Sequence, residues 1–215
     1  MLFLRYESFG EYVKRYPITS LLLLANVLMF VLVMIDGGVG NGFTLVEYGA
    51  LYDFLMENGR GDWWRYFAAM FLHFSFSHLL FNCFALFVFA PPLENILGKW
   101  AYLIFYLGSG LVGNLISELV HVMEGNDVEP YISAGASGAV YGVYGAFLFM
   151  TLFYRHLLDE ASRKMVQTIL IIGIIYSFVS PYIGGAHIGV FAHLGGLLGG
   201  FLIFGAFFRR ERLQR

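Results

Sequence analysis

The chain of 215 residues is apolar and poor in charge, with 59% hydrophobic and 13% charged residues and a mean hydropathy of +0.70. Soluble domains carry about 25% charged residues, so we expect a membrane protein, and the length suits one domain. The net charge of −2 favours no nucleic-acid partner, and the lone cysteine, Cys83, excludes an intrachain disulfide framework.

Six apolar segments follow one another along the chain, and each is close to the ~20 residues that cross a bilayer as a helix. They predict an all-α membrane protein, a six-transmembrane-helix bundle over residues 18–208. A short tail of residues 1–17 precedes the bundle, and a basic tail of residues 209–215 follows it. The segments are Ile18–Ile35, Phe76–Leu93, Trp100–Leu119, Ala136–Tyr154, Met165–Tyr182 and Ile188–Phe208.

The basic residues predict how the bundle is oriented. Of the 13 Lys and Arg residues, all but Arg60 and Arg65 fall in the two tails or in the loops after the second and fourth segments. Cytoplasmic loops carry the excess of Lys and Arg, so both termini are expected in the cytoplasm. The chain is compact and shows no organelle-targeting segment, which favours a bacterial inner membrane.

The first outer loop, residues 36–75, is long for a small bundle and rich in aromatic residues such as Trp63 and Trp64. Two short amphipathic helices embedded in the membrane interface would fit this composition. A loose extracellular loop is the alternative, and the aromatic content favours the embedded helices.

A few polar residues inside the apolar segments carry the functional signal, because intramembrane polar groups must pair or line a wet cavity. His78 and Asn82 stand four apart and therefore share one helix face. Their donors could converge on one point, or they could make ordinary hydrogen bonds between helices. No Asp, Glu, Lys or Arg lies near the middle of a segment, which argues against a pump or a charge-translocating transporter.

Ser137 stands among small residues, in the run Gly135-Ala136-Ser137-Gly138. Small neighbours permit a substrate backbone to approach a nucleophilic serine closely. A serine at the first turn of a helix also lies beside backbone N–H groups without intrahelical partners, which could stabilise an oxyanion. The alternative is a helix-packing serine, since small residues are common where membrane helices meet.

His193 opens the run HLGGLLGG, in which Gly196 and Gly200 form a row that lets another helix approach closely. If this segment packs on the one that contains Ser137, the imidazole of His193 could act as its general base. Tyr141, one turn after Ser137, could then stack on the imidazole. The alternative for His193 is a lone buried histidine bonded to a backbone carbonyl.

Taken together, these motifs resemble those of the rhomboid intramembrane serine proteases over nearly the whole chain. The matching stretches are WWRYF, HFSFSHLLFN, GASG with Tyr141 after it, and AHLGGLLGG. The resemblance implies a catalytic dyad of Ser137 as nucleophile and His193 as general base and acid. It also implies an oxyanion hole from His78, Asn82 and the Ser137 backbone N–H, supported by Tyr141, Gly135, Gly196 and Gly200. Trp64, Arg65 and Glu94 would be structural supports.

The resemblance implies a serine endopeptidase that cleaves transmembrane segments of single-pass membrane proteins near the outer surface of the bilayer. The reaction would pass through an acyl-enzyme and need neither cofactor nor metal. One alternative is a non-catalytic rhomboid-like membrane chaperone or binding protein, which would usually lack the serine or the histidine. Another is a metal protease using His73, His78 and His193. It is disfavoured because His73 and His78, five residues apart, do not share one helix face, and no acidic residue on a helix accompanies them.

Overall fold

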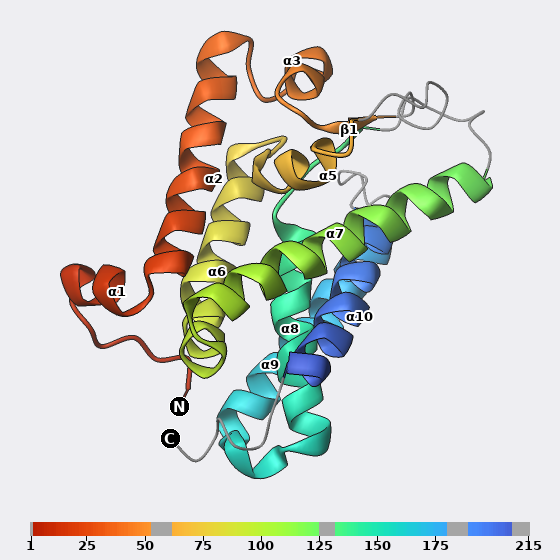
Figure 1. The fold of residues 1–215 in the computed structure, drawn as a ribbon. Helices are drawn as coiled ribbons and strands as arrows, with labels where there is room; N and C mark the ends of the chain where they lie inside the picture. Colours follow the sequence, from red (N-terminus) through yellow and green to blue (C-terminus); the bar gives the residue numbers. More distant parts are fainter. Residues whose placement is uncertain (1, 53–61, 125–131, 180–188, 208–215) are drawn as a thin grey trace.

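The computed structural model describes residues 2–52, 62–124, 132–179 and 189–207, and most of these are helical. Figure 1 shows α2 and α6 running side by side, with α7 crossing in front of α8 and α10. The longer helices are α2 (Pro17–Asp36), α6 (Phe76–Leu97), α7 (Lys99–Glu124), α8 (Ser137–Phe153), α9 (Glu160–Val179) and α10 (Val190–Phe207). The short elements are α1 (Phe9–Arg15), α3 (Gly42–Glu47), β1 (Leu51–Tyr52), α5 (Arg65–Ala68), η1 (Ala69–Phe71), β2 (Ile132–Ser133) and η2 (Arg155–Leu157).

The predicted fold class, an all-α membrane bundle, is confirmed, and each of the six apolar segments overlaps one long helix. Among the described residues, α2, α6, α7, α9 and α10 are long and apolar enough to cross a membrane. The helix over the fourth segment, α8, is apolar but only 17 residues long. The ends of the fifth and sixth predicted segments, and the C-terminal tail 209–215, lie outside the described residues.

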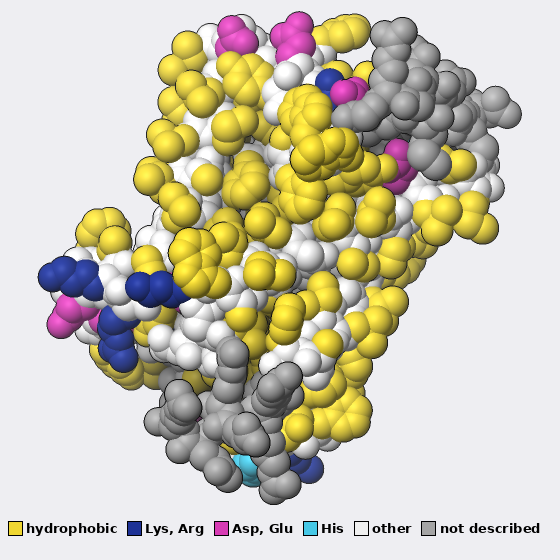
Figure 2. All heavy atoms as spheres, in the orientation of Figure 1, with side chains coloured by type: hydrophobic (Ala, Val, Ile, Leu, Met, Phe, Trp, Pro, Cys, Tyr) yellow, Lys and Arg dark blue, Asp and Glu magenta, His cyan; other side chains and the backbone are white. Residues whose placement is uncertain are grey.

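The centre of the bundle is α8. Its residues 138–147 are buried without interruption, as expected for a helix that is surrounded by others on every side. The outer helices instead expose apolar side chains such as Leu24 on α2 and Ile172 on α9, which suit contact with lipid. Figure 2 shows this apolar covering over the visible face, with acidic side chains near α3 and most basic ones near α1.

The first outer loop holds two short α-helices, α3 and α5, in its described part, followed by the 3₁₀ turn η1. That they lie in the membrane interface stays a prediction. The guanidinium of Arg65 donates to the carbonyl oxygens of Val46 and Ala50 and lies over the Trp64 ring, 4.7 Å from its centroid. Arg65 therefore ties α5 to the turn after α3.

A two-stranded antiparallel pairing, which the sequence did not reveal, joins this loop to the segment before α8. Leu51 pairs with Ser133, and Tyr52 pairs with Ile132. Strands of two residues are too short to leave an alternating pattern in a sequence. The pairing fixes the chain just ahead of Ser137 against the first outer loop.

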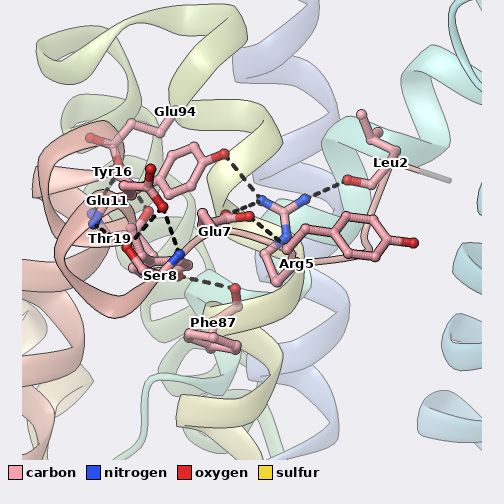
Figure 3. Close-up of polar contacts among 11 residues, drawn as sticks. Leu2, Arg5, Glu7, Ser8, Glu11, Tyr16, Thr19, Phe87 and Glu94 are labelled. Atoms are coloured by element: carbon pink, nitrogen blue, oxygen red, sulfur yellow. Dashed lines mark hydrogen bonds and ion pairs between the residues drawn. The ribbon is translucent and has the colours of Figure 1, made fainter.

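Glu94 of α6 is buried and accepts three hydrogen bonds from the beginning of α2. The donors are the backbone N–H groups of Ile18 and Thr19, both at 2.9 Å, and the Thr19 hydroxyl at 2.7 Å (Figure 3). A carboxylate at a helix N-terminus satisfies orphan N–H groups and complements the helix dipole. The predicted span ended at Leu93, before this charge, but α6 continues to Leu97 because α2 holds the carboxylate.

The residues before α2 pack against the end of the bundle that the sequence predicts to face the cytoplasm. The Phe3 ring is buried, with its centroid 4.8 Å from that of Phe89 and 5.0 Å from that of Phe147. Arg5 donates to the Leu2 carbonyl oxygen and to the Tyr16 hydroxyl, as Figure 3 shows. These contacts connect the N-terminal segment to α6 and α8.

We predict that Glu94→Gln destabilises the protein by about 1–3 kcal/mol, because the amide keeps one acceptor oxygen but turns an NH₂ group toward the donors of α2. Glu160→Gln is the matched control. Its carboxylate is exposed and forms a surface ion pair with Lys164, so the change should stay within about 0.5 kcal/mol. Denaturation in detergent micelles measures both variants, and equal stability of the two would contradict the capping role of Glu94.

Candidate active site

Ser137 is the first residue of α8, where the chain enters the helix from an extended segment. The first intrahelical bond donates from the Val140 N–H to the Ala136 carbonyl oxygen, so the N–H groups before Val140 have no partner within the helix. Just upstream, the Gly135 N–H donates to the Ala69 carbonyl oxygen at 2.8 Å. The Gly135 N–H is therefore already used, whereas the N–H groups of the first turn, from Ser137 on, have no partner within α8.

Gly135 has a φ of +142°, in the region that favours glycine. A Cβ atom at this position would lie only 2.8 Å from Cε1 and 3.0 Å from Nε2 of His78. Glycine here therefore provides both the turn into α8 and the room for the His78 ring to lie beside it.

The Ser137 hydroxyl oxygen lies 2.9 Å from Nε2 of His193, which stands one turn into α10. His193 is buried. The distance is that of a hydrogen bond, and it joins a hydroxyl to the nitrogen that could remove its proton. The structure thus brings together two residues that are 56 positions apart in the chain.

Close packing of α8 on α10 makes this contact possible. A Cβ atom at Gly196 would strike the backbone of Gly138, and one at Gly200 would strike the backbone of Gly142. The second glycine row of α10, Gly195 and Gly199, faces α7 instead, where added Cβ atoms would meet Ile116 and Val112. The row of Gly196 and Gly200 that the sequence predicts, together with this second row, therefore lets α10 approach two helices at once.

The ring of Tyr141 stacks on the imidazole of His193, with centroids 4.2 Å apart and planes within 6° of parallel. This is the arrangement that the spacing of Tyr141 after Ser137 predicts. On its far side, the Tyr141 hydroxyl lies against Gly173 of α9, where a Cβ atom would collide with it. Tyr141 thus fills the space between His193 and α9.

His78 and Asn82 lie on α6, on the side of the site that Gly135 faces. The Asn82 side-chain amide donates to the His78 carbonyl oxygen at 2.9 Å, one turn back in the same helix. The His78 ring is nearly parallel to that of Phe74, and its edge meets His73 at a centroid distance of 4.9 Å. His78 therefore adjoins Ser137 through Gly135, while one N–H of Asn82 is used within α6.

His73, which precedes α6, is buried, and this burial lowers its pKa to about 3. It is therefore neutral at physiological pH and brings no positive charge to His78. Across the residues that the structure describes, no group of three His, Cys, Asp or Glu side chains could hold a metal ion.

One contact at this site escaped the sequence analysis. The hydroxyl oxygen of Ser177, on α9, lies 2.9 Å from Nδ1 of His193, and Ser177 is buried. The sequence feature that could have indicated this contact is a serine inside the fifth apolar segment. It was missed because nothing in the spacing of Ser177 connects it to α8 or α10.

The chain is similar over most of its length to known proteins of one family. The family model described as Rhomboid domain matches residues 60–210. The chain is 32% identical to YdcA of Bacillus subtilis (strain 168) over 202 aligned residues, and these residues make up 94% of each protein. It is 34% identical to the rhomboid protease GluP of the same organism, covering 85% of this chain but 33% of GluP. It is 31% identical to the rhomboid protease AarA of Providencia stuartii, covering 74% of this chain and 60% of AarA.

Proposed function

This chain belongs to the rhomboid family, and on that premise we propose that it is an intramembrane serine endopeptidase with Ser137 and His193 as its catalytic dyad. The observation that carries the proposal is the 2.9 Å separation of the Ser137 hydroxyl and His193 Nε2, at the beginning of a central buried helix. The names of GluP and AarA as rhomboid proteases agree with it. A non-catalytic relative would usually lack the serine or the histidine, and this chain has both.

In the proposed reaction, Ser137 attacks a peptide carbonyl while His193 Nε2 takes the hydroxyl proton. His193 then gives that proton to the leaving amine, and water hydrolyses the acyl-enzyme by the same route in reverse. The negative oxygen of the tetrahedral intermediate would lie beside the Ser137 backbone N–H, His78 and Asn82. The side-chain amide of Asn82 has two N–H groups. One donates to the His78 carbonyl oxygen, so the other remains to bind the negative oxygen.

The proposed substrates are transmembrane segments of single-pass membrane proteins. Such a segment must unwind locally before a carbonyl can reach Ser137, because helical backbone groups are already hydrogen-bonded. We place the cut near the outer surface of a bacterial inner membrane, with both termini of this chain in the cytoplasm. The distribution of Lys and Arg supports this orientation.

The function is tested with purified protein in detergent and a panel of single-pass transmembrane substrates. We expect the parent to produce fragments on a gel and Ser137→Ala to produce none, because the alanine has no nucleophile. Equal fragment formation by both proteins would reveal a contaminating protease and refute the assignment of Ser137.

A further inference from the structure

The imidazole of His193 lies between two serine hydroxyls. Ser137 of α8 faces Nε2 and Ser177 of α9 faces Nδ1, both at 2.9 Å. A hydroxyl can donate or accept, so these two distances leave open which ring nitrogen carries the proton. That choice decides whether the nitrogen facing Ser137 is a base.

A third group, the Gly173 carbonyl, resolves the choice. Its oxygen lies 2.8 Å from the Ser177 hydroxyl oxygen, one turn earlier in α9. A carbonyl only accepts, and a serine hydroxyl has a single proton, so in this pair Ser177 donates to Gly173. The Ser177 oxygen then offers a lone pair to His193, which must supply the proton from Nδ1.

We propose that Ser177 is a positioning residue that holds the neutral imidazole of His193 in its Nδ1–H tautomer, and this proposal rests on the function proposed for Ser137 and His193. With the proton on Nδ1, Nε2 has a free lone pair and accepts the Ser137 hydroxyl proton when the serine oxygen attacks. In the opposite arrangement Ser177 donates to Nδ1, and Nε2–H points at Ser137. The imidazole then cannot take the serine proton.

The same contact also acts after the proton has moved. The imidazolium carries protons on both nitrogens, and the Nδ1–H remains bonded to the Ser177 oxygen. Hydrogen bonds to charged groups are stronger than those between neutral ones, so the bond strengthens as the reaction proceeds. Ser177 thus provides, with a neutral oxygen, the acceptor that a carboxylate provides in a catalytic triad.

Two residues one turn apart on α9 place this acceptor. Gly173 lets the Tyr141 hydroxyl lie directly against the helix backbone, and Ser177 reaches the edge of the imidazole. Tyr141 meanwhile covers the face of the same ring. The orientation of His193 therefore depends on α9 staying against α8 and α10.

The first test compares Ser177→Ala and Ser177→Thr with the parent, using a cleavable transmembrane substrate in micelles. Threonine keeps a hydroxyl that can donate to the carbonyl one turn back. The matched control is Ser20→Ala in α2, where the hydroxyl makes the same type of bond to the Tyr16 carbonyl oxygen at 2.8 Å, away from the site.

We expect Ser177→Ala to lower kcat about 10- to 100-fold with KM within about twofold, because only the transition state carries the imidazolium. Ser177→Thr should recover most of kcat, and Ser20→Ala should match the parent. Melting in detergent separates this effect from unfolding. A folded Ser177→Ala variant with the kcat of the parent would overturn the proposal.

The second test reads the tautomer without relying on activity. In protein with ¹⁵N-labelled histidine, the His193 ring signals are identified by their loss in His193→Ala. We expect Nδ1–H in the parent and a population of Nε2–H in Ser177→Ala. Nε2–H in the parent would overturn the role of Ser177. A parent that shows Nδ1–H yet cleaves nothing in the panel and resists labelling at Ser137 would refute the proposed function and not this tautomer assignment.

Discussion

Replacing His193 with alanine is expected to lower kcat by about 10⁴-fold or more, the largest activity effect that the site predicts besides loss of Ser137. Among the described residues, the imidazole of His193 is the group that can take the Ser137 proton. Its Nε2 lies 2.9 Å from the Ser137 hydroxyl oxygen. Removing the base from a serine hydrolase leaves only the contributions of the oxyanion hole and of binding. A time course of fragment formation at saturating substrate measures the loss.

Two further proteins make this result interpretable. His156→Ala changes an exposed histidine after α8 and should cleave at the rate of the parent. The double variant Ser137→Ala with His193→Ala should be no slower than either single variant. When two residues act as a unit, removing either one already removes the rate enhancement that both provide. A His193→Ala variant within tenfold of the parent would show that another group serves as the base.

Gly200→Ala is expected to destabilise the protein by roughly 2–4 kcal/mol, the largest stability effect among our predictions. The added methyl group would occupy the space of the Gly142 backbone, and a backbone cannot rotate away as a side chain can. Relief requires α10 to move from α8, which also lengthens the contact between His193 and Ser137. Melting in detergent and the cleavage assay measure the two consequences.

The matched control is Gly10→Ala in α1, where the new methyl group would meet no atom within 4 Å. Because alanine favours a helix more than glycine does, this change should leave stability unchanged or raise it by up to about 1 kcal/mol. Melting of Gly200→Ala at the temperature of the parent would show that the approach of α8 and α10 does not depend on the glycine row.

The sequence predicts the parts of this fold that rest on local periodicity. Apolar runs of bilayer length predict the long helices. In a six-span bundle the second, fourth and sixth runs cross the membrane in the same direction, so this topology predicts that Ser137 and His193 lie at one level. The glycine row and the spacing of Tyr141 also predict the contacts that α8 makes with α10, because residues three or four apart share a helix face. The stacking of Tyr141 on His193 agrees with that spacing.

The features that the sequence did not predict depend on neighbours that are distant in the chain. The resemblance implies a structural role for Glu94 but not its partner: α6 continues through Glu94 to Leu97, and the beginning of α2 binds the carboxylate. The β1–β2 pairing lacks any alternating pattern. Ser177 looks like any small polar residue in a membrane helix until α9 is placed against His193.

Covalent labelling of Ser137 by a fluorophosphonate, read by mass spectrometry of the folded protein in detergent, tests the central claim most directly, because it needs no substrate. We expect the parent to carry one phosphonyl group on the peptide containing Ser137, and His193→Ala to be labelled at least 100-fold more slowly, since attack by the serine oxygen needs a base. Failure to label the parent at Ser137, or equal labelling of the two proteins, would contradict a Ser137–His193 dyad.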